Sequence, residues 1–357
     1  MLGSLTKSNN INNSNDMATL KDQWAVGPHF WNIRTDYKVM LVLNVGTQMS
    51  LIRLESGRFL IIDAAPLTND LLAEINTLTS NGTLIDAILH THPFHSDYIE
   101  ELSKHYPNAA LYGAPRHLKK FPSLQWTGRI DDPTVLNKWA PEVEMRIPAG
   151  SEFVEPAESN HFNSVWVFHR QSRTLHVDDT IMYLSDPPIL AKLLVKAGMS
   201  FHPTLKHGGL HETKEAPLQF RDFVKGVIAD WDFDNLCAAH SQSKIGGAKN
   251  ELIELLAESE SVFLELSEKY AKKETSHHPW QVEVDELPRA SETATSVEIE
   301  MVVTGDGGNL SKTKPLPGVV LSQNPDDPTF TTDHLMQSLH PNETYRPALY
   351  ITQTCNA

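Results

Sequence analysis

The stretch His90-Thr91-His92-Pro93-Phe94-His95 places three histidines within six residues, directly after the apolar run Leu84-Ile85-Asp86-Ala87-Ile88-Leu89. The apolar run is short and follows Asn81-Gly82, which predicts a buried strand of a parallel sheet. The histidines then lie at the carboxyl end of that strand, where open α/β sheets bind their ligands. Because imidazole is the commonest protein ligand for zinc and similar ions, this loop predicts a metal site.

The residues after the histidines predict a helix that begins near Asp97. Asp97 is a typical N-cap, and Glu100 three residues later would complete a capping box. Asp97 is also a candidate catalytic carboxylate that could swing towards the metal or move a proton. The capping role is favoured, and the catalytic role stays open.

The pattern His90-x-His92-x-Phe94-His95 resembles the His-x-His-x-Asp-His signature of the metallo-β-lactamase superfamily, with Phe94 in place of the aspartate. Residues 49–54 and 58–65 predict a hairpin that ends near Asp63, as in the first strands of that family. Three further stretches follow in the family's order: His161-Phe162-Asn163-Ser164-Val165, Leu175-His176-Val177-Asp178-Asp179-Thr180 and Leu236-Cys237-Ala238-Ala239-His240. The resemblance covers roughly residues 39–272.

The resemblance implies a set of metal ligands and one supporting carboxylate. Asp63 would hold the histidine loop from behind the ligands. Neighbouring strand residues point to opposite faces, so only one of Asp178 and Asp179 is expected to reach the metal, and the family's turn aligns with Asp179. The implied ligands are His90, His92 and His161 for one ion, His95 and His240 for a second, and Asp179 for the first or as a bridge.

Such ligands explain a hydrolytic chemistry. Three imidazoles leave one tetrahedral position open, and a metal lowers the pKa of a water bound there from about 15.7 towards about 7. The result is a hydroxide available at neutral pH. Asp179 and Asp97 are the candidate catalytic residues.

Phe94 is the departure from the family pattern, because a phenyl ring offers no lone pair to a metal. Three consequences stay open: a site for one ion, a second ion held weakly by His95, Asp179 and His240, or a chain that has lost catalysis. The expected cofactor is zinc, one ion or two, with iron or manganese as alternatives.

The sequence therefore predicts a metal-dependent hydrolase of a small-molecule ester, thioester or lactone that uses metal-bound hydroxide. The alternative is a non-catalytic metal-binding or partner-binding protein that keeps the fold with a degraded second metal site. An iron-dependent redox protein ranks last. The loop of residues 201–211 could add Lys206 or His207 to a substrate site.

Composition limits the partners. Asp and Glu number 45 against 30 Lys and Arg, which gives a net charge of −15 and a pI of about 5.5. This balance disfavours binding to nucleic acid, which relies on clustered cations. The chain has two cysteines, and we find neither a membrane-spanning run nor a signal peptide, so a cytoplasmic protein with a small-molecule substrate and no membrane partner is expected.

Periodicity predicts an α/β protein, and the resemblance implies a four-layer αββα sandwich with a C-terminal extension. Residues 1–16 are expected to be disordered, 17–279 to form the metallo-β-lactamase-like domain, and 280–357 to form a Pro-rich C-terminal extension, with a small β appendage as one alternative. A strand at 297–303 could form a hairpin that turns at 304–309. Helices are predicted at 68–78, 189–196, 218–228 and 249–272.

Overall fold

The computed structural model describes residues 20, 22–39, 43–185, 197–240, 242–277, 298–300 and 350–352. Internal contacts divide the chain into two compact units, residues 1–279 and 280–357. The predicted disordered segment 1–16 and the predicted helix 189–196 lie outside the described residues. In the second unit, β17 (Glu298–Glu300) pairs antiparallel with β18 (Tyr350–Thr352). The expected hairpin partner close after 304–309 is therefore wrong, because the strand that pairs with β17 comes from near the C-terminus.

The larger sheet of the first unit has seven strands in the order β1-β2-β5-β6-β7-β8-β9. Strands β1 to β6 pair antiparallel along this order, and β6 to β9 pair parallel. The predicted hairpin is confirmed as β5 and β6, joined by a turn in which Gly57 has a φ of 80°. The predicted buried parallel strand is confirmed as β7. The strands are β1 (Ala25–Gly27), β2 (Phe30–Thr35), β5 (Thr47–Arg53), β6 (Phe59–Ile62), β7 (Ile85–His90), β8 (Ala110–Gly113) and β9 (Trp126–Arg129).

The second sheet of this unit has five strands in the order β10-β11-β12-β15-β16. Strands β12 and β15 are parallel neighbours, so their carboxyl ends meet at the same edge. These strands are β10 (Val143–Arg146), β11 (Trp166–His169), β12 (Thr174–His176), β15 (Asn235–Cys237) and β16 (Ser243–Lys244). Two short pairs accompany the sheets: β3 (Lys38–Val39) with β4 (Leu43–Asn44), and β13 (Ile181–Leu184) with β14 (Gly198–Phe201).

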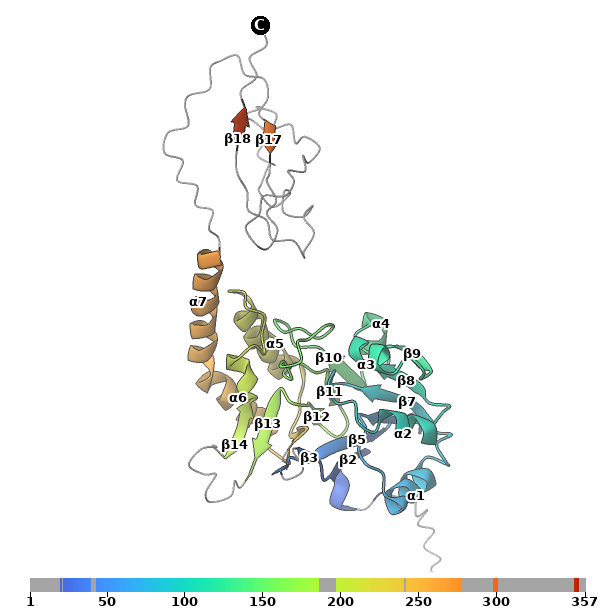
Figure 1. Cartoon of the computed structure of the whole chain (residues 1–357). Coiled ribbons are helices and arrows are strands. Elements are labelled where there is room, and N and C mark those ends of the chain that lie inside the picture. The colour runs from blue at the N-terminus through green and yellow to red at the C-terminus, as the bar shows by residue number, and fades with distance from the viewer. Residues whose placement is uncertain are drawn as a thin grey trace, which may run out of the picture. The chain divides into compact units, whose positions relative to one another are not determined.

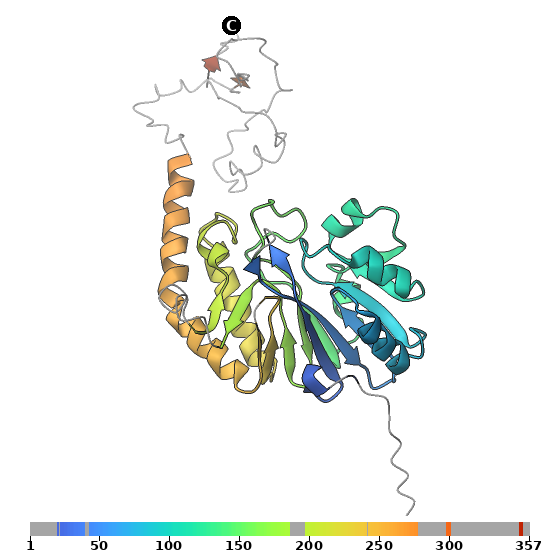
Figure 2. The ribbon, with the colours of Figure 1, turned by 60° about the horizontal axis from the view of Figure 1, so that its bottom comes forward.

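Alternation of side chains along the strands builds four layers. Along the β11 segment, Val165 and Val167 pack between the two sheets, whereas Trp166 and Phe168 pack against helices on the other face. The opposite face of the seven-stranded sheet packs against α1 and α2 through residues such as Ile88. Helices thus cover both outer faces of two stacked sheets, which gives the predicted αββα order (Figures 1 and 2).

The helices partly follow the predicted ranges. The helix predicted at 68–78 is α1, with Thr68 as an N-cap whose hydroxyl accepts from the amide of Leu71. The helix predicted at 249–272 is two helices, because the chain breaks at Ser259. The described helices are α1 (Asn69–Leu78), α2 (Ile99–His105), α3 (Pro115–Lys120), α4 (Pro133–Leu136), α5 (Ala216–Asp230), α6 (Ala248–Glu258) and α7 (Glu260–His277).

The start of α2 corrects the predicted capping box. The N-cap is Tyr98, which has a φ of 66° in the left-handed region and makes no side-chain capping bond. Left-handed backbone costs a residue with a Cβ roughly 1 to 2 kcal/mol. Asp97 therefore does not cap α2, and its carboxylate accepts a hydrogen bond from the hydroxyl of Tyr37 instead (2.8 Å).

Within the described part of the chain, the structure contains no helix that combines the length and the apolar character needed to cross a membrane.

Candidate metal centre

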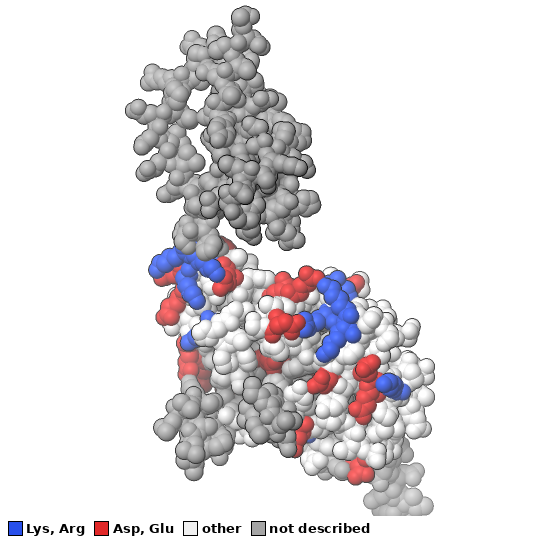
Figure 3. Space-filling model, viewed as in Figure 1, with Lys and Arg blue, Asp and Glu red and all other residues white. Residues whose placement is uncertain are grey.

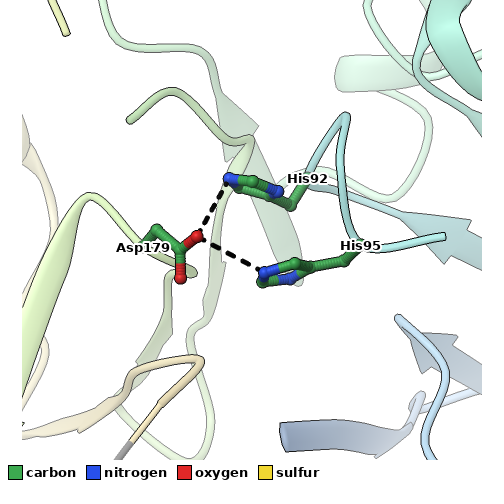
Figure 4. A group of neighbouring side chains, drawn as sticks. All are labelled: His92, His95 and Asp179. Atoms are coloured by element: carbon green, nitrogen blue, oxygen red, sulfur yellow. Dashed lines mark ion pairs between the residues drawn. The ribbon is translucent and has the colours of Figure 1, made fainter. Parts of the chain in front are cut away.

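The loop after β7 brings two of its histidines to one carboxylate. Nε2 of His92 lies 3.5 Å from Oδ2 of Asp179, and Nε2 of His95 lies 3.4 Å from the same oxygen (Figure 4). All three side chains offer ligand atoms within 4.8 Å of one another. His92 and Asp179 are buried, and His95 is partly exposed. This group, His92 with His95 and Asp179, is called the ligand cluster below.

Topology explains why Asp179 and His240 meet here. Asp179 follows β12 and His240 follows β15, and these strands are parallel neighbours whose ends share one edge. Nε2 of His240 lies 3.1 Å from Oδ1 of Asp179. The other ring nitrogen of His240, Nδ1, lies 2.8 Å from the carbonyl of Gly46, which requires that Nδ1 carry a proton and donate it. In the neutral ring Nε2 is then a lone pair directed at the carboxylate, an arrangement that a cation between the two atoms would relieve.

Charge and burial act differently on the two histidines of the ligand cluster. Burial, aided by the charge of His95, lowers the pKa of His92 to about 4, so this ring is neutral and able to bind metal. Burial also acts to lower the pKa of His95, but the charges of Asp179 and Asp178 and its hydrogen bonds to them outweigh burial and raise it well above its ordinary value. The same histidines hold the pKa of Asp179 well below its ordinary value, against the effect of burial.

A buried network lies directly behind the ligand cluster and is centred on Thr91. Asp63 accepts from the backbone amide of Thr91 at 2.8 Å, as the expected supporting role of Asp63 requires. The Thr91 hydroxyl lies 2.7 Å from Oδ2 of Asp63 and 2.6 Å from Oδ2 of Asp178. A hydroxyl has one proton, so one of the two carboxyls must supply the other. Burial and the charge of Asp178 raise the pKa of Asp63, which identifies Asp63 as the protonated member.

Asp178 connects this network to the ligand cluster. Its Oδ1 lies 3.5 Å from Nδ1 of His95, on the side of the ring opposite Asp179. The amide nitrogen of Gln48 lies 3.3 Å from the same oxygen. Asp178 and Asp179 thus flank the two nitrogens of one imidazole, and Asp178 fixes the orientation of that ring. His176, which completes the buried group of Asp63 and Asp178, lies 3.1 Å from Oδ2 of Asp63.

His161 lies beside the ligand cluster, where it stacks on Phe94. The two rings are 4.1 Å apart and nearly parallel, and the His161 ring is 6.0 Å from that of His92. The guanidinium of Arg116 lies over Phe94 at 4.4 Å. The ring of Phe94 therefore occupies the space between Arg116 and His161, next to the position where the related signature has a carboxylate.

The structure places His90 apart from the ligand cluster. Its ring packs against those of His117, at 5.7 Å, and Trp126, at 6.1 Å. Both ring nitrogens of His90 are buried and have no hydrogen-bond partner among the described residues. Burial lowers the pKa of His90 to about 3, so the ring is neutral.

A cavity of about 300 Å³ opens onto the ligand cluster. Sequence reasoning named His95, Asp97, His161, Asp179 and His240 among its lining residues but missed two tyrosines. Tyr37 carried no motif in the sequence, and Tyr98 was visible only as part of a predicted helix start. The side chains of Lys206 and His207 are exposed and do not line this cavity. The remaining lining residues are Thr47, Ala64, Phe94 and Ser96.

The ligand cluster has the spacing of a tetrahedral metal site. Two atoms that each lie about 2.0 to 2.1 Å from a tetrahedral zinc are separated by about 3.3 to 3.4 Å. The two contacts of Asp179 Oδ2, at 3.5 and 3.4 Å, match that separation and are long for charged hydrogen bonds. Oδ1 of Asp179 is buried without an aligned hydrogen-bond donor among the described residues. The residues present therefore fit a metal ion.

Comparison with known proteins places the sequence in a family. A family model described as "Domain of unknown function (DUF4336)" matches residues 29–216, more than half of the 357 residues. The chain belongs to this family. The DUF4336 match contains the whole ligand cluster and the Asp63 network, whereas His240 lies beyond its end. Among curated proteins, none matches the sequence.

Solved metallo-β-lactamases are similar in structure to this DUF4336 chain. DIM-1, in a crystal exposed to ceftazidime, has 12% sequence identity and a TM-score of 0.44, over 66% of this chain and 95% of that chain. A protein from Erythrobacter litoralis with β-mercaptoethanol in its active site has 15% identity and a TM-score of 0.41, over 68% and 93%. A protein from Pontibacter korlensis has 12% identity and a TM-score of 0.42, over 65% and 97%.

Proposed function

We propose that the chain is a metal-dependent hydrolase of a small-molecule ester, thioester or lactone. One observation carries this proposal: His92, His95 and Asp179 direct ligand atoms to one point on the wall of a cavity. Three protein ligands with one open position are typical of catalytic metal sites, whereas structural sites fill all four positions. We propose zinc as the ion, because the ligands are two imidazoles and a carboxylate.

The proposed ligand set is smaller than the one implied by the resemblance. His92, His95 and Asp179 would hold the ion, and His240 would add its Nε2 on the Oδ1 side of Asp179. When bound, a divalent ion would lower the pKa of a coordinated water and polarise a carbonyl. Asp178 would keep the His95 ring oriented from behind.

Hydrolysis also requires a group that moves a proton between the attacking water and the leaving group. His161 lines the cavity beside the ligand cluster, and the stack with Phe94 fixes its ring. We assign the proton transfer to His161. Asp97 lies at the mouth of the cavity with its carboxylate bonded to Tyr37, which places it on the substrate side and away from the metal.

Turnover by the zinc-loaded full-length protein tests the proposal. We expect hydrolysis of at least one class in a panel of small esters, thioesters and lactones. His92→Ala is expected to lower kcat/KM by about a hundredfold or more, since even the residues behind metal ligands contribute 10- to 100-fold. His105→Ala, which removes an exposed histidine of α2, is the matched control and should keep full activity.

Two outcomes would count against the hydrolase. Zinc binding without turnover across the panel would favour the alternative, a metal-binding protein that keeps the fold. Turnover that survives His92→Ala unchanged would show that the reaction does not use the ligand cluster.

A further inference from the structure

Three side chains gather at the mouth of the cavity, beside the ligand cluster. The hydroxyl of Tyr37 donates to Oδ2 of Asp97 at 2.8 Å, and Tyr98 follows Asp97 in the chain and lines the same cavity. The hydrogen bond to Asp97, burial and the charges of Asp97 and Tyr98 raise the pKa of Tyr37 to about 12. The three groups are therefore close together, and Tyr37 keeps its proton and its neutral ring.

The charge of this mouth is negative. Among the described residues that line the cavity there is neither a lysine nor an arginine. The exposed carboxylate of Asp97 forms no ion pair with any described cation, and its hydrogen bond comes from a neutral phenol. An anionic substrate group would meet repulsion from Asp97 at this position, and a cationic group would meet attraction.

The nearest basic side chains are engaged elsewhere. Arg116 pairs with Glu158 at 2.5 Å and lies over the ring of Phe94. The ammonium of Lys120 donates to the hydroxyl of Ser96 at 2.5 Å. On the face shown in Figure 3, basic side chains lie beside acidic ones in small groups. These contacts leave the carboxylate of Asp97 as the uncompensated charge at the mouth.

The aromatic groups at the mouth differ in what they can offer. Both faces of Phe94 are covered, one by His161 and the other by Arg116, so Phe94 forms a wall. Tyr37 and Tyr98 line the cavity beside Asp97. Tyr98 keeps a left-handed backbone that is unfavourable for a tyrosine, and such strain persists where the surrounding structure requires it and gathers at binding sites. Tyrosine rings beside a carboxylate are the chemistry that recognises alkylammonium ions.

We infer that Tyr37, Asp97 and Tyr98 form a subsite for a cationic group of the substrate, of the alkylammonium class. The inference rests on the proposed hydrolase, because it assigns the substrate of that same cavity. The substrate would then be an ester, thioester or lactone that carries an ammonium group, with the carbonyl at the ligand cluster and the cation at the mouth. The negative charge of Asp97 and the rings of the tyrosines would select against anionic acyl compounds.

Binding of two matched alcohols to the zinc-loaded full-length protein tests the subsite without any need for turnover. Choline and 3,3-dimethylbutan-1-ol have nearly the same shape and the same hydroxyl, and differ in the charge of the quaternary centre. Calorimetry should show that choline binds about tenfold more tightly than the neutral alcohol, as a cation–π contact together with an ion pair predicts. Asp97→Asn should remove most of that preference and leave the affinity for the neutral alcohol unchanged.

Two further variants separate a local subsite from general charge and from folding. Glu101→Gln removes an exposed carboxylate of α2 that does not line the cavity, and the preference for choline should survive it. Tyr98→Leu keeps an apolar side chain and removes the ring, and the preference should fall about three- to fivefold. Equal binding of the two alcohols by the unmodified protein, or no binding of choline, would overturn the subsite.

The corresponding acetate esters separate the subsite from the hydrolase. Faster hydrolysis of acetylcholine than of 3,3-dimethylbutyl acetate, with the difference lost in Asp97→Asn, supports both inferences. Equal hydrolysis of the two esters retains the hydrolase and overturns the subsite. Binding of choline that depends on Asp97, without hydrolysis of either ester, retains the subsite and contradicts the hydrolase.

Discussion

Replacement of Asp179 by alanine is expected to lower the affinity for zinc by more than about a hundredfold, since residues that only support metal ligands already contribute 10- to 100-fold. The carboxylate is the common partner of three imidazoles. Its Oδ2 faces His92 and His95, and its Oδ1 faces His240 at 3.1 Å. Without it the remaining nitrogens share no charged ligand, and the positive charge of an ion is no longer balanced. Competition with a chromophoric chelator measures the loss.

Asp178→Asn provides the comparison for this variant. Asp178 contacts the far nitrogen of His95 and the Thr91 hydroxyl but does not face the point between the imidazoles. We therefore expect a smaller loss of zinc affinity than in Asp179→Ala. Equal losses in the two variants would contradict the assignment of Asp179 as the ligand, and so would zinc affinity that is unchanged in Asp179→Ala.

Replacement of Phe94 by aspartate is expected to raise the zinc content from one ion per chain to two. The phenyl ring now fills the space between Arg116 and His161, beside His95. A carboxylate there would provide the anionic ligand that the second group of imidazoles lacks, and it would release His161 from the stack. Elemental analysis of the purified variant measures the change.

Phe94→Leu is the matched control for this change, because it removes the ring without adding a carboxylate. Its zinc content should stay at one ion per chain. A second ion in both variants would show that the ring blocks the site sterically, and a second ion in neither would show that the degraded site cannot be restored at position 94.

The elements that sequence predicted well have strong local signals. The β5–β6 hairpin follows from two apolar runs around Glu55-Ser56-Gly57, and β7 follows from an unbroken apolar run. The order of the short motifs also predicted that Asp179 and His240 would approach the histidine loop. Parallel pairing of β12 with β15 explains that approach, and this pairing depends on the fold as a whole.

The departures come from tertiary contacts that a local pattern does not contain. Asp97 satisfies the rules for an N-cap, yet the hydrogen bond from Tyr37, sixty residues earlier in the chain, holds its carboxylate at the cavity. The apolar repeat of 249–272 continues through Ser259, so periodicity could not indicate that the chain turns there. His90 shares the motif of His92, but its ring lies in a buried aromatic environment with His117 and Trp126.

The measurement that tests the account most directly is the zinc content of the full-length protein after chelation and reloading, compared with that of His92→Ala. The account predicts one tightly bound zinc per chain, and none in the variant. A protein that retains no zinc, or a variant that retains as much as the unmodified chain, would contradict the central claim that His92, His95 and Asp179 hold a metal ion.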